Sequence, residues 1–312
     1  MEKQNVIIIG SGPAGLTAAI YTARANLKPL LFAGSVYGGQ LMTTTEVENF
    51  PGFPEGVTGP VLMQQMIQQA ERFGTQFKYE NISRTDFSDP TNLRVWSGDQ
   101  EYAARAIIVA TGSTPRKLGL PSEDTLWGHG VSSCATCDGA FYKGKDVAVI
   151  GGGDSAMEEA AFLTHFANKV HVIHRRDQLR ASKIMADRAM ANPKIEFIWN
   201  TGIEEVLGSE KVTGLRLKNL VSGDITELPL DGMFLAIGHL PTTDFLKDTA
   251  GQSQVALDAQ GFVLATDHTR TNIAGVFVAG DVHDHHYQQA ITAAGMGCMA
   301  AMDAEKWLEM NG

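Results

Sequence analysis

Two glycine-rich turns constrain the fold of this chain more than any other feature. Each turn lies between a run of apolar residues and a segment with helical character. The first turn, residues 10–15, has the spacing Gly-x-Gly-x-x-Gly and follows the apolar run 6–9. The second, residues 151–156, has the spacing Gly-x-Gly-x-x-Ala and follows the run 147–150. This arrangement is typical of dinucleotide-binding βα units, and two of them indicate an internal duplication.

The order of the remaining apolar runs predicts how the two domains share the chain. A length of 312 residues suggests two domains. Runs at 107–110 and 276–279 each end in glycine, as buried parallel strands tend to do, and a helix over 288–308 closes the chain. We therefore expect an α/β fold of two Rossmann-like three-layer domains, with the second inserted into a discontinuous first. The expected bounds are 1–115 with 244–312, and 116–243.

Charge and hydropathy exclude several classes of partner. The chain has 35 acidic and 25 basic residues, a formal charge of -10, which disfavours binding to nucleic acid. No apolar run reaches the roughly 18 residues that a membrane helix needs. The first residues, 1–5, run directly into the first strand without the features of a signal peptide. We expect a cytoplasmic protein without a membrane segment.

The first glycine turn predicts a site for a pyrophosphate. Gly10 permits the tight turn, Gly12 allows close approach of a ligand, and Gly15 lets the helix pack on the strand. Residues 30–34 lack the acid that often binds the ribose, so a glycine turn without a ligand stays an alternative. Asp281, just past the 276–279 run, could bind a polyol such as a flavin ribitol, or could be a turn or N-cap residue.

The second glycine turn predicts a preference for NADPH. The strand after it, 169–173, ends in His174, Arg175 and Arg176, with Arg180 close behind. Arginines at this place can hold a 2′-phosphate with charge-assisted bonds, whereas an acid would repel it. The alternative is a solvated basic start of a helix.

Cys134 and Cys137 form a CxxC pair, which predicts a redox-active dithiol. At the start of a helix the two sulfurs lie one turn apart, and the helix N-terminus favours a thiolate. A zinc site would need further ligands. A structural disulfide that closes a loop of four residues would stabilise the fold only weakly. Inert buried thiols are the remaining alternative. No metal site is predicted. Asp138 follows directly and could exchange a proton with a thiolate, or could be a helix-start acid. Cys298 is interpreted as a core residue.

The motifs together resemble those of low-molecular-weight thioredoxin reductases of the bacterial, fungal and plant type. The resemblance covers nearly the whole chain in order, and the Cys-Ala-Thr-Cys-Asp-Gly motif at 134–139 is highly specific. Other matching segments are 10–15, 38–41, 174–176, 237–239, 279–281 and 289–292.

The resemblance implies a homodimer of two-domain subunits that binds FAD in the discontinuous domain and NADPH in the inserted domain, which also carries the dithiol. It implies catalytic roles for Cys134, Cys137 and Asp138. FAD contacts carried over are Ser11, Gly12, Pro13, Ala14, Gln40, Asn49, Asp281, Gln288, Gln289 and Ala290. NADPH contacts carried over are Ser155, Arg175, Arg176 and Arg180. Further cofactor-binding positions are Gly10, Gly15, Ser35, Val36, Gly39, Ile82, Thr111, Gly112, Gly151, Gly153, Asp154, His174, Ile237 and Gly280.

Three positions depart from the family pattern. Gln288 stands where arginine is frequent, Ala140 precedes Phe141 where some members have two phenylalanines, and His129 replaces a frequent arginine. The first change concerns a flavin contact, and the other two concern docking of the protein substrate.

The implied activity is reduction of thioredoxin. Reducing equivalents pass from NADPH through FAD and the dithiol, with Cys137 nearer the flavin and Cys134 attacking the partner. The family also implies rotation of one domain between two states, with hinges near Thr114–Pro115 and Pro241–Thr242. The alternatives are a related flavoprotein reductase with another disulfide or peroxidase partner, one with ferredoxin, or a flavin-binding sensor.

Overall fold

The computed structural model describes residues 3–44 and 46–311; Met1, Glu2, Thr45 and Gly312 lie outside the described part. The chain forms two compact units. The first contains the residues up to Thr114 and those from Leu240 onwards, and the second is Pro115–His239. The predicted α/β class with two Rossmann-like units is confirmed. The return crossing comes earlier than the expected residue 243, because β7 (Ser113–Pro115) and β16 (His239–Pro241) pair with each other where the chain changes unit.

The first unit is built on a mixed sheet. Its path is β3 (Gln76–Lys78), β2 (Leu30–Phe32), β1 (Gln4–Ile9), β6 (Gln100–Val109), β5 (Leu93–Ser97) and β4 (Arg84–Asp86), with β17 (Val276–Val278) also on β6. Strand β6 is longer than the sequence predicted. Its first half pairs antiparallel with β5, and its second half pairs parallel with β1 and β17.

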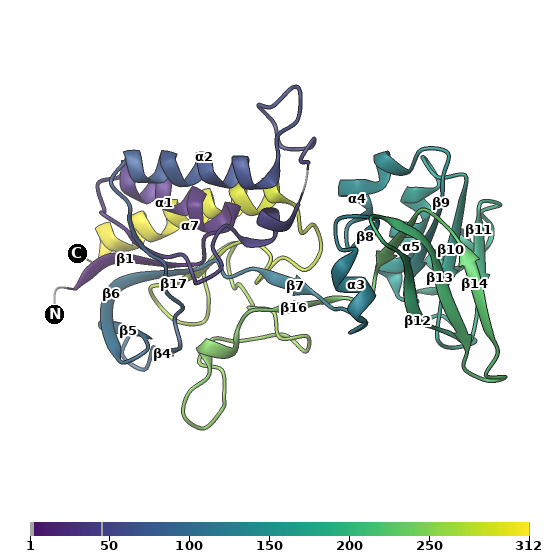
Figure 1. Cartoon of the computed structure of the whole chain (residues 1–312). Coiled ribbons are helices and arrows are strands. Elements are labelled where there is room, and N and C mark those ends of the chain that lie inside the picture. The colour runs from purple at the N-terminus through teal and green to yellow at the C-terminus, as the bar shows by residue number, and fades with distance from the viewer. Residues whose placement is uncertain (1–2, 45, 312) are drawn as a thin grey trace. The chain divides into compact units, whose positions relative to one another are not determined.

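Helices α1 (Pro13–Arg24), α2 (Gly59–Arg72) and α7 (Ala290–Met310) cover one face of this sheet (Figure 1). Alternation along β1 separates the two cores: Val6 and Ile8 pack under the helices, whereas Ile7 and Ile9 pack on the other face. The second face is covered by the segment that follows the short helix η3 (Asp244–Leu246). The remaining short helix is η1 (Gly39–Thr43).

The second unit has a wholly parallel five-stranded sheet. Its order is β11 (Ile195–Ile198), β10 (Lys169–Ile173), β9 (Asp146–Ile150), β15 (Gly232–Leu235) and β8 (Val131–Ser132). One face packs on α5 (Asp154–Leu163) and its neighbours, and the other packs on an antiparallel sheet of β12 (Thr201–Gly208), β13 (Val212–Asn219) and β14 (Ile225–Pro229). The helices not yet named are α3 (Pro121–Thr125), α4 (Ala135–Asp138), η2 (Gly139–Tyr142) and α6 (Lys183–Met190).

The register of this parallel sheet places two sequence motifs at one edge. Ile150 at the end of β9 pairs with Ile173 and Leu235, and Ser132 at the end of β8 pairs with Phe234. The second glycine turn therefore begins at the same carboxyl edge as the segment that carries the two cysteines. In open α/β sheets ligands bind outside the carboxyl ends of the strands. This edge is the natural place for a nucleotide and a reactive group in the second unit.

Candidate functional site

The first glycine turn is shaped to admit a ligand at one position and to pack tightly at two others. Gly10 has φ +112°, and a Cβ there would overlap the carbonyl of Ala110. A Cβ at Gly15 would overlap the carbonyl of Gly10 itself. At Gly12 a Cβ would meet nothing within 4 Å, and helix α1 starts at the next residue. The open space thus lies before the free N–H groups of a helix N-terminus, which suits a pyrophosphate.

A second loop lies against this turn. The hydroxyl of Ser11 donates to the Ala33 carbonyl at 2.8 Å and accepts from the Gly38 N–H at 2.9 Å. A Cβ at Gly39 would lie 3.3 Å from the Cα of Gly12. Among the predicted positions here, Val36 is 83% exposed. Ser35 and Gln40 are also exposed, so all three side chains are accessible to a ligand.

Several of the other predicted positions of the first site are joined by hydrogen bonds. The Gln40 amide donates to the Ser113 carbonyl at 2.7 Å, and the Gln288 amide donates to the Ser113 hydroxyl at 3.4 Å. Asn49 donates to the Gln289 side chain at 3.3 Å, although 240 positions separate them in sequence. Thr111 donates to the Thr242 carbonyl at 2.7 Å. Ile82 differs, because its side chain is buried in the core, and only its backbone could reach a ligand.

Asp281 follows the end of β17 by three residues and lies close to the same helix start. A Cβ at the preceding Gly280 would lie 2.9 Å from the Cβ of Ala14, the second residue of α1. Burial, with the nearby Asp284, raises the pKa of Asp281 to about 7. A desolvated carboxyl is stabilised in its charged form by hydroxyl donors. Asp281 and Gly12 therefore fit the polyol and the phosphates of one elongated nucleotide.

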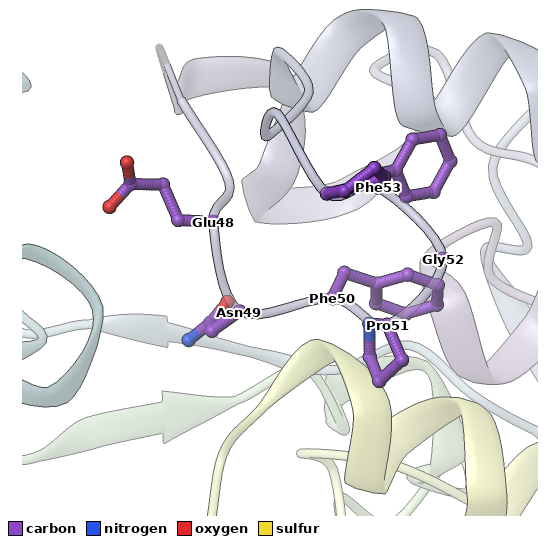
Figure 2. A pocket seen from close by; sticks show the side chains of 7 residues that line it. Glu48, Asn49, Phe50, Pro51, Gly52 and Phe53 are labelled. Carbon is purple, nitrogen blue, oxygen red and sulfur yellow. The ribbon is translucent and has the colours of Figure 1, made fainter.

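A shallow hollow of about 510 Å³ follows in the same unit, lined by Glu48–Pro54. Figure 2 shows Phe50 and Phe53 on one part of the loop, with Asn49 between them and Glu48. The two rings are tilted with centroids 6.4 Å apart. Because Asn49 is tied to Gln289, this apolar hollow adjoins the predicted first site.

The second glycine turn also has glycines that pack tightly and one glycine that faces open space. A Cβ at Gly151 would overlap the carbonyl of Ala236, and one at Gly152 would overlap the ring of His174. At Gly153 a Cβ would meet nothing within 4 Å, and α5 begins at the next residue. The carbonyl of Gly152 accepts the N–H groups of Arg180 and Ala181.

The basic residues after β10 divide into one buried ring and three exposed cations. Burial lowers the pKa of His174, and its Nε2 lies 3.1 Å from the carbonyl oxygen of Gln178. His174 thus supports the turn as a neutral ring. Arg175, Arg176 and Arg180 are exposed, and their positive charges also lower the pKa of His174. At the turn itself, Asp154 accepts the N–H and the hydroxyl of Ser182 at 2.7 and 2.9 Å.

The cysteine pair forms a disulfide at the start of a one-turn helix. The Cα atoms of Cys134 and Cys137 are 5.3 Å apart, and Cys134 is the N-cap of α4. The Cys134 sulfur accepts the N–H of Cys137 at 3.2 Å and lies 3.3 Å from the hydroxyl of Thr136. Both groups can donate to a thiolate after reduction, which favours Cys134 as the nucleophile. Solvent exposure instead favours Cys137 as the nucleophile, because Cys137 is exposed and Cys134 is half-buried.

Asp138 lies partly buried directly after this pair. Burial raises the pKa of Asp138, and a hydrogen bond with Ser132 partly offsets the rise. The Ser132 hydroxyl also accepts the Cys134 N–H at 3.0 Å. Ser132 therefore bonds the backbone of the first cysteine and moderates the pKa of the acid. An acid with a raised pKa beside a disulfide can hold a proton for an emerging thiolate.

Two features were missed or misread in the sequence. Cys298 was expected in the core, but it is half-buried on α7, with its sulfur 3.9 Å from that of Met302. Buried positions of α7 include Gly297 and Ala301, so Cys298 falls on the adjoining face. Ser132 carried no sequence signal, since a serine at the end of a short strand is ordinary.

The two Rossmann-like units with their glycine turns define a nucleotide-binding protein. Its Cys134–Cys137 disulfide is of the kind found in redox-active sites. Residues 4–297 match the family described as pyridine nucleotide-disulphide oxidoreductase. A thioredoxin reductase of Streptomyces coelicolor is 56% identical over 309 residues, covering 98% of this chain and 94% of that one. A protein of Mycobacterium leprae described as a bifunctional thioredoxin reductase/thioredoxin is 54% identical, covering 97% and 65%.

The fold agrees with the sequence comparison. The solved structure of a thioredoxin reductase from Giardia duodenalis superposes with a TM-score of 0.92 at 43% identity, covering 99% of this chain and all of that one. The chain therefore belongs to the pyridine nucleotide-disulphide oxidoreductases, and within them to the thioredoxin reductase family. No helix in the described residues is long and apolar enough to span a membrane.

Proposed function

We propose that this protein is an NADPH-dependent thioredoxin-disulfide reductase that uses FAD. The observation that carries the proposal is the Cys134–Cys137 disulfide at the start of α4, on the same sheet edge as the second glycine turn. The bifunctional relative, whose name joins a reductase to a thioredoxin, supports thioredoxin as the partner. The test is NADPH-dependent reduction of thioredoxin by the wild type and by Cys134→Ser.

The residues present fit both cofactors. The open space at Gly12, the carboxyl of Asp281 and the hollow beside Asn49 suit FAD in the first unit. The open space at Gly153 and the exposed arginines suit NADPH in the second. When bound, NADPH supplies a hydride, and FAD delivers the electron pair to the disulfide.

The side chains of the second unit then perform the exchange. Opening the disulfide leaves two sulfurs, and Asp138 supplies a proton to one of them. The Cys134 thiolate, held by the Cys137 N–H, attacks a sulfur of the thioredoxin disulfide and forms a mixed disulfide. Cys137 then attacks the Cys134 sulfur, which restores the enzyme disulfide and releases thioredoxin as a dithiol.

The proposal includes rotation of one unit relative to the other, because one disulfide must meet both a flavin and a protein partner. The chain crosses between the units at β7 and β16, which are short paired strands suited to hinges. We also propose a homodimer in the cytoplasm, on the strength of the family resemblance.

Substitution in the first glycine turn should separate flavin binding from folding. Gly12→Val is expected to fold normally, since Gly12 has φ -70° and open space at its Cβ, yet to lose most bound FAD. Gly15→Ala should instead destabilise the unit, because its Cβ would overlap the Gly10 carbonyl. Flavin content by absorbance and thermal unfolding of both variants measure this. A Gly12→Val variant that retains full flavin content would contradict the assigned site.

Replacing Asp138 by asparagine should lower activity without lowering stability. We expect thioredoxin reduction to fall about a hundredfold, because the proton donor is lost. Since burial raises the pKa of Asp138 in the folded state, stability is lost as pH rises from the unfolded pKa to the folded one. Asparagine cannot ionise, so the variant should be at least as stable as the wild type above that range. Asp224→Asn, an exposed acid, is the control for both measurements. Equal activity of Asp138→Asn and wild type would refute the role.

A further inference from the structure

The ring of His174 packs directly on the middle glycine of the second turn. A Cβ at Gly152 would overlap three atoms of this ring, Cε1, Nδ1 and Nε2. Gly152 does not have a positive φ, so the ring, rather than the backbone, keeps a larger residue out of this position. His174 is only 6% exposed, which leaves little of its ring open to a ligand. His174 therefore acts on the nucleotide site through its neighbours.

The first neighbour is the segment that carries the three arginines, residues 175–180, which we call the arginine loop. The Nε2 of His174 lies 3.1 Å from the carbonyl oxygen of Gln178, within this loop. At the end of the loop, Arg180 donates its backbone N–H to the Gly152 carbonyl at 2.7 Å. The loop is thus fixed near its middle by the His174 ring and at its end by the glycine turn.

The second neighbour is Trp199, the residue that follows β11. The rings of Trp199 and His174 are nearly perpendicular, with centroids 6.3 Å apart and an interplanar angle of 81°. The Trp199 ring is itself stacked on Phe197, with centroids 5.0 Å apart and an angle of 8°. Aromatic pairs with these separations and orientations attract each other. Trp199 therefore holds the His174 ring from the side of β11.

Backbone bonds join the same two segments. His174 donates its N–H to the Ile198 carbonyl at 3.0 Å, and its carbonyl accepts the Thr201 N–H at 3.0 Å. Trp199 lies between these two partners. The backbone bonds fix the place where the arginine loop begins, and the ring contact fixes the direction of the His174 side chain.

We propose that His174 and Trp199 are positioning residues for the nucleotide, which hold the arginine loop where it can bind a 2′-phosphate. This rests on the proposed function, in which the arginines select NADPH. Charge-assisted bonds from arginine to phosphate depend on geometry. A loop that is already ordered also loses less conformational entropy when it binds. Both effects favour the nucleotide that carries the phosphate.

The test measures binding of NADP⁺ and NAD⁺ to the oxidised, flavin-loaded protein by isothermal titration calorimetry. Neither nucleotide can reduce the flavin, so binding is separated from turnover. Trp199→Phe keeps an aromatic ring, and Trp199→Leu removes it. We expect Trp199→Leu to bind NADP⁺ about three- to tenfold more weakly, the effect of losing one aromatic contact. Its affinity for NAD⁺, and both affinities of Trp199→Phe, should stay within about twofold of the wild type.

His174→Leu is a second disruptive variant, which cannot bond to the Gln178 carbonyl and should show the same selective loss of NADP⁺. It decides the question if Trp199→Leu does not fold. Trp127→Leu is the matched control, because Trp127 is a half-buried tryptophan of the same unit. It should leave both affinities unchanged. Thermal unfolding is measured for every variant.

The selectivity for NADP⁺ distinguishes this inference from the proposed function. A wild type that prefers NADP⁺, with the preference unchanged in Trp199→Leu and His174→Leu, overturns this inference alone. An equal loss of both nucleotides in these variants also overturns it. A wild type that binds NAD⁺ as tightly as NADP⁺ would refute the proposed use of NADPH, and this inference with it.

Discussion

A Cys137→Ser variant is expected to accumulate as a covalent complex with thioredoxin, whereas Cys134→Ser is not. In both variants, thioredoxin reduction should fall by about a thousandfold or more, because either sulfur is needed to complete the cycle. Only Cys137→Ser keeps the nucleophile while losing the residue that resolves the mixed disulfide. Reduced variants are mixed with oxidised thioredoxin and separated on non-reducing gels.

The structural reason is the hydrogen bonding of the Cys134 sulfur. Cys134 receives the Cys137 N–H and lies next to the Thr136 hydroxyl, so its thiolate is stabilised. Exposure alone would favour Cys137. The two criteria therefore give opposite predictions, and the gel separates them. A covalent complex formed by Cys134→Ser and not by Cys137→Ser would reverse the assigned roles. The flavin of both variants should still be reduced by NADPH, which serves as the control.

Removing two arginines after β10 is expected to abolish the preference for NADPH. In the variant carrying Arg175→Ala and Arg176→Ala, the KM for NADPH should rise about a hundredfold, because two charge-assisted contacts to a 2′-phosphate are lost. The KM for NADH should change little, since NADH has no such phosphate. Both guanidinium groups are exposed beside the open turn at Gly153 and are available to a ligand.

Arg188→Ala is the matched control for this pair. It removes an exposed arginine from α6 in the same unit and should leave both KM values unchanged. Steady-state kinetics with each nucleotide measure the effect. A wild type that uses NADH as efficiently as NADPH, or a double variant with an unchanged KM for NADPH, would contradict the assignment.

The parts of the site that the sequence could predict depend on local geometry. The spacing of Gly10, Gly12 and Gly15 requires a particular turn, and the structure shows the tight packing at the outer two and the open space at the middle one. The CxxC spacing likewise predicted a helix start, and Cys134 is the N-cap of α4. Such features are carried by neighbouring residues, so one sequence is enough to find them.

The parts that could not be predicted depend on long-range pairing. Asn49 and Gln289 are 240 positions apart in the sequence, yet their side chains are hydrogen-bonded in the folded first unit. Neither residue carries a local signal that the other is its partner. The sequence also did not predict the first half of β6, which pairs with β5. Apolar and polar residues alternate less clearly there than in the apolar run at the end of the strand.

The central claim is that the Cys134–Cys137 pair passes electrons from NADPH to a protein disulfide. The most direct measurement follows NADPH oxidation and thiol formation together after adding oxidised thioredoxin to the flavin-loaded protein. The account predicts one thioredoxin disulfide opened for each NADPH consumed. In Cys134→Ser, thiol formation should be lost, and NADPH oxidation should stop after the single reduction of the flavin. NADPH consumption without new thioredoxin thiols, or undiminished turnover in Cys134→Ser, would contradict it.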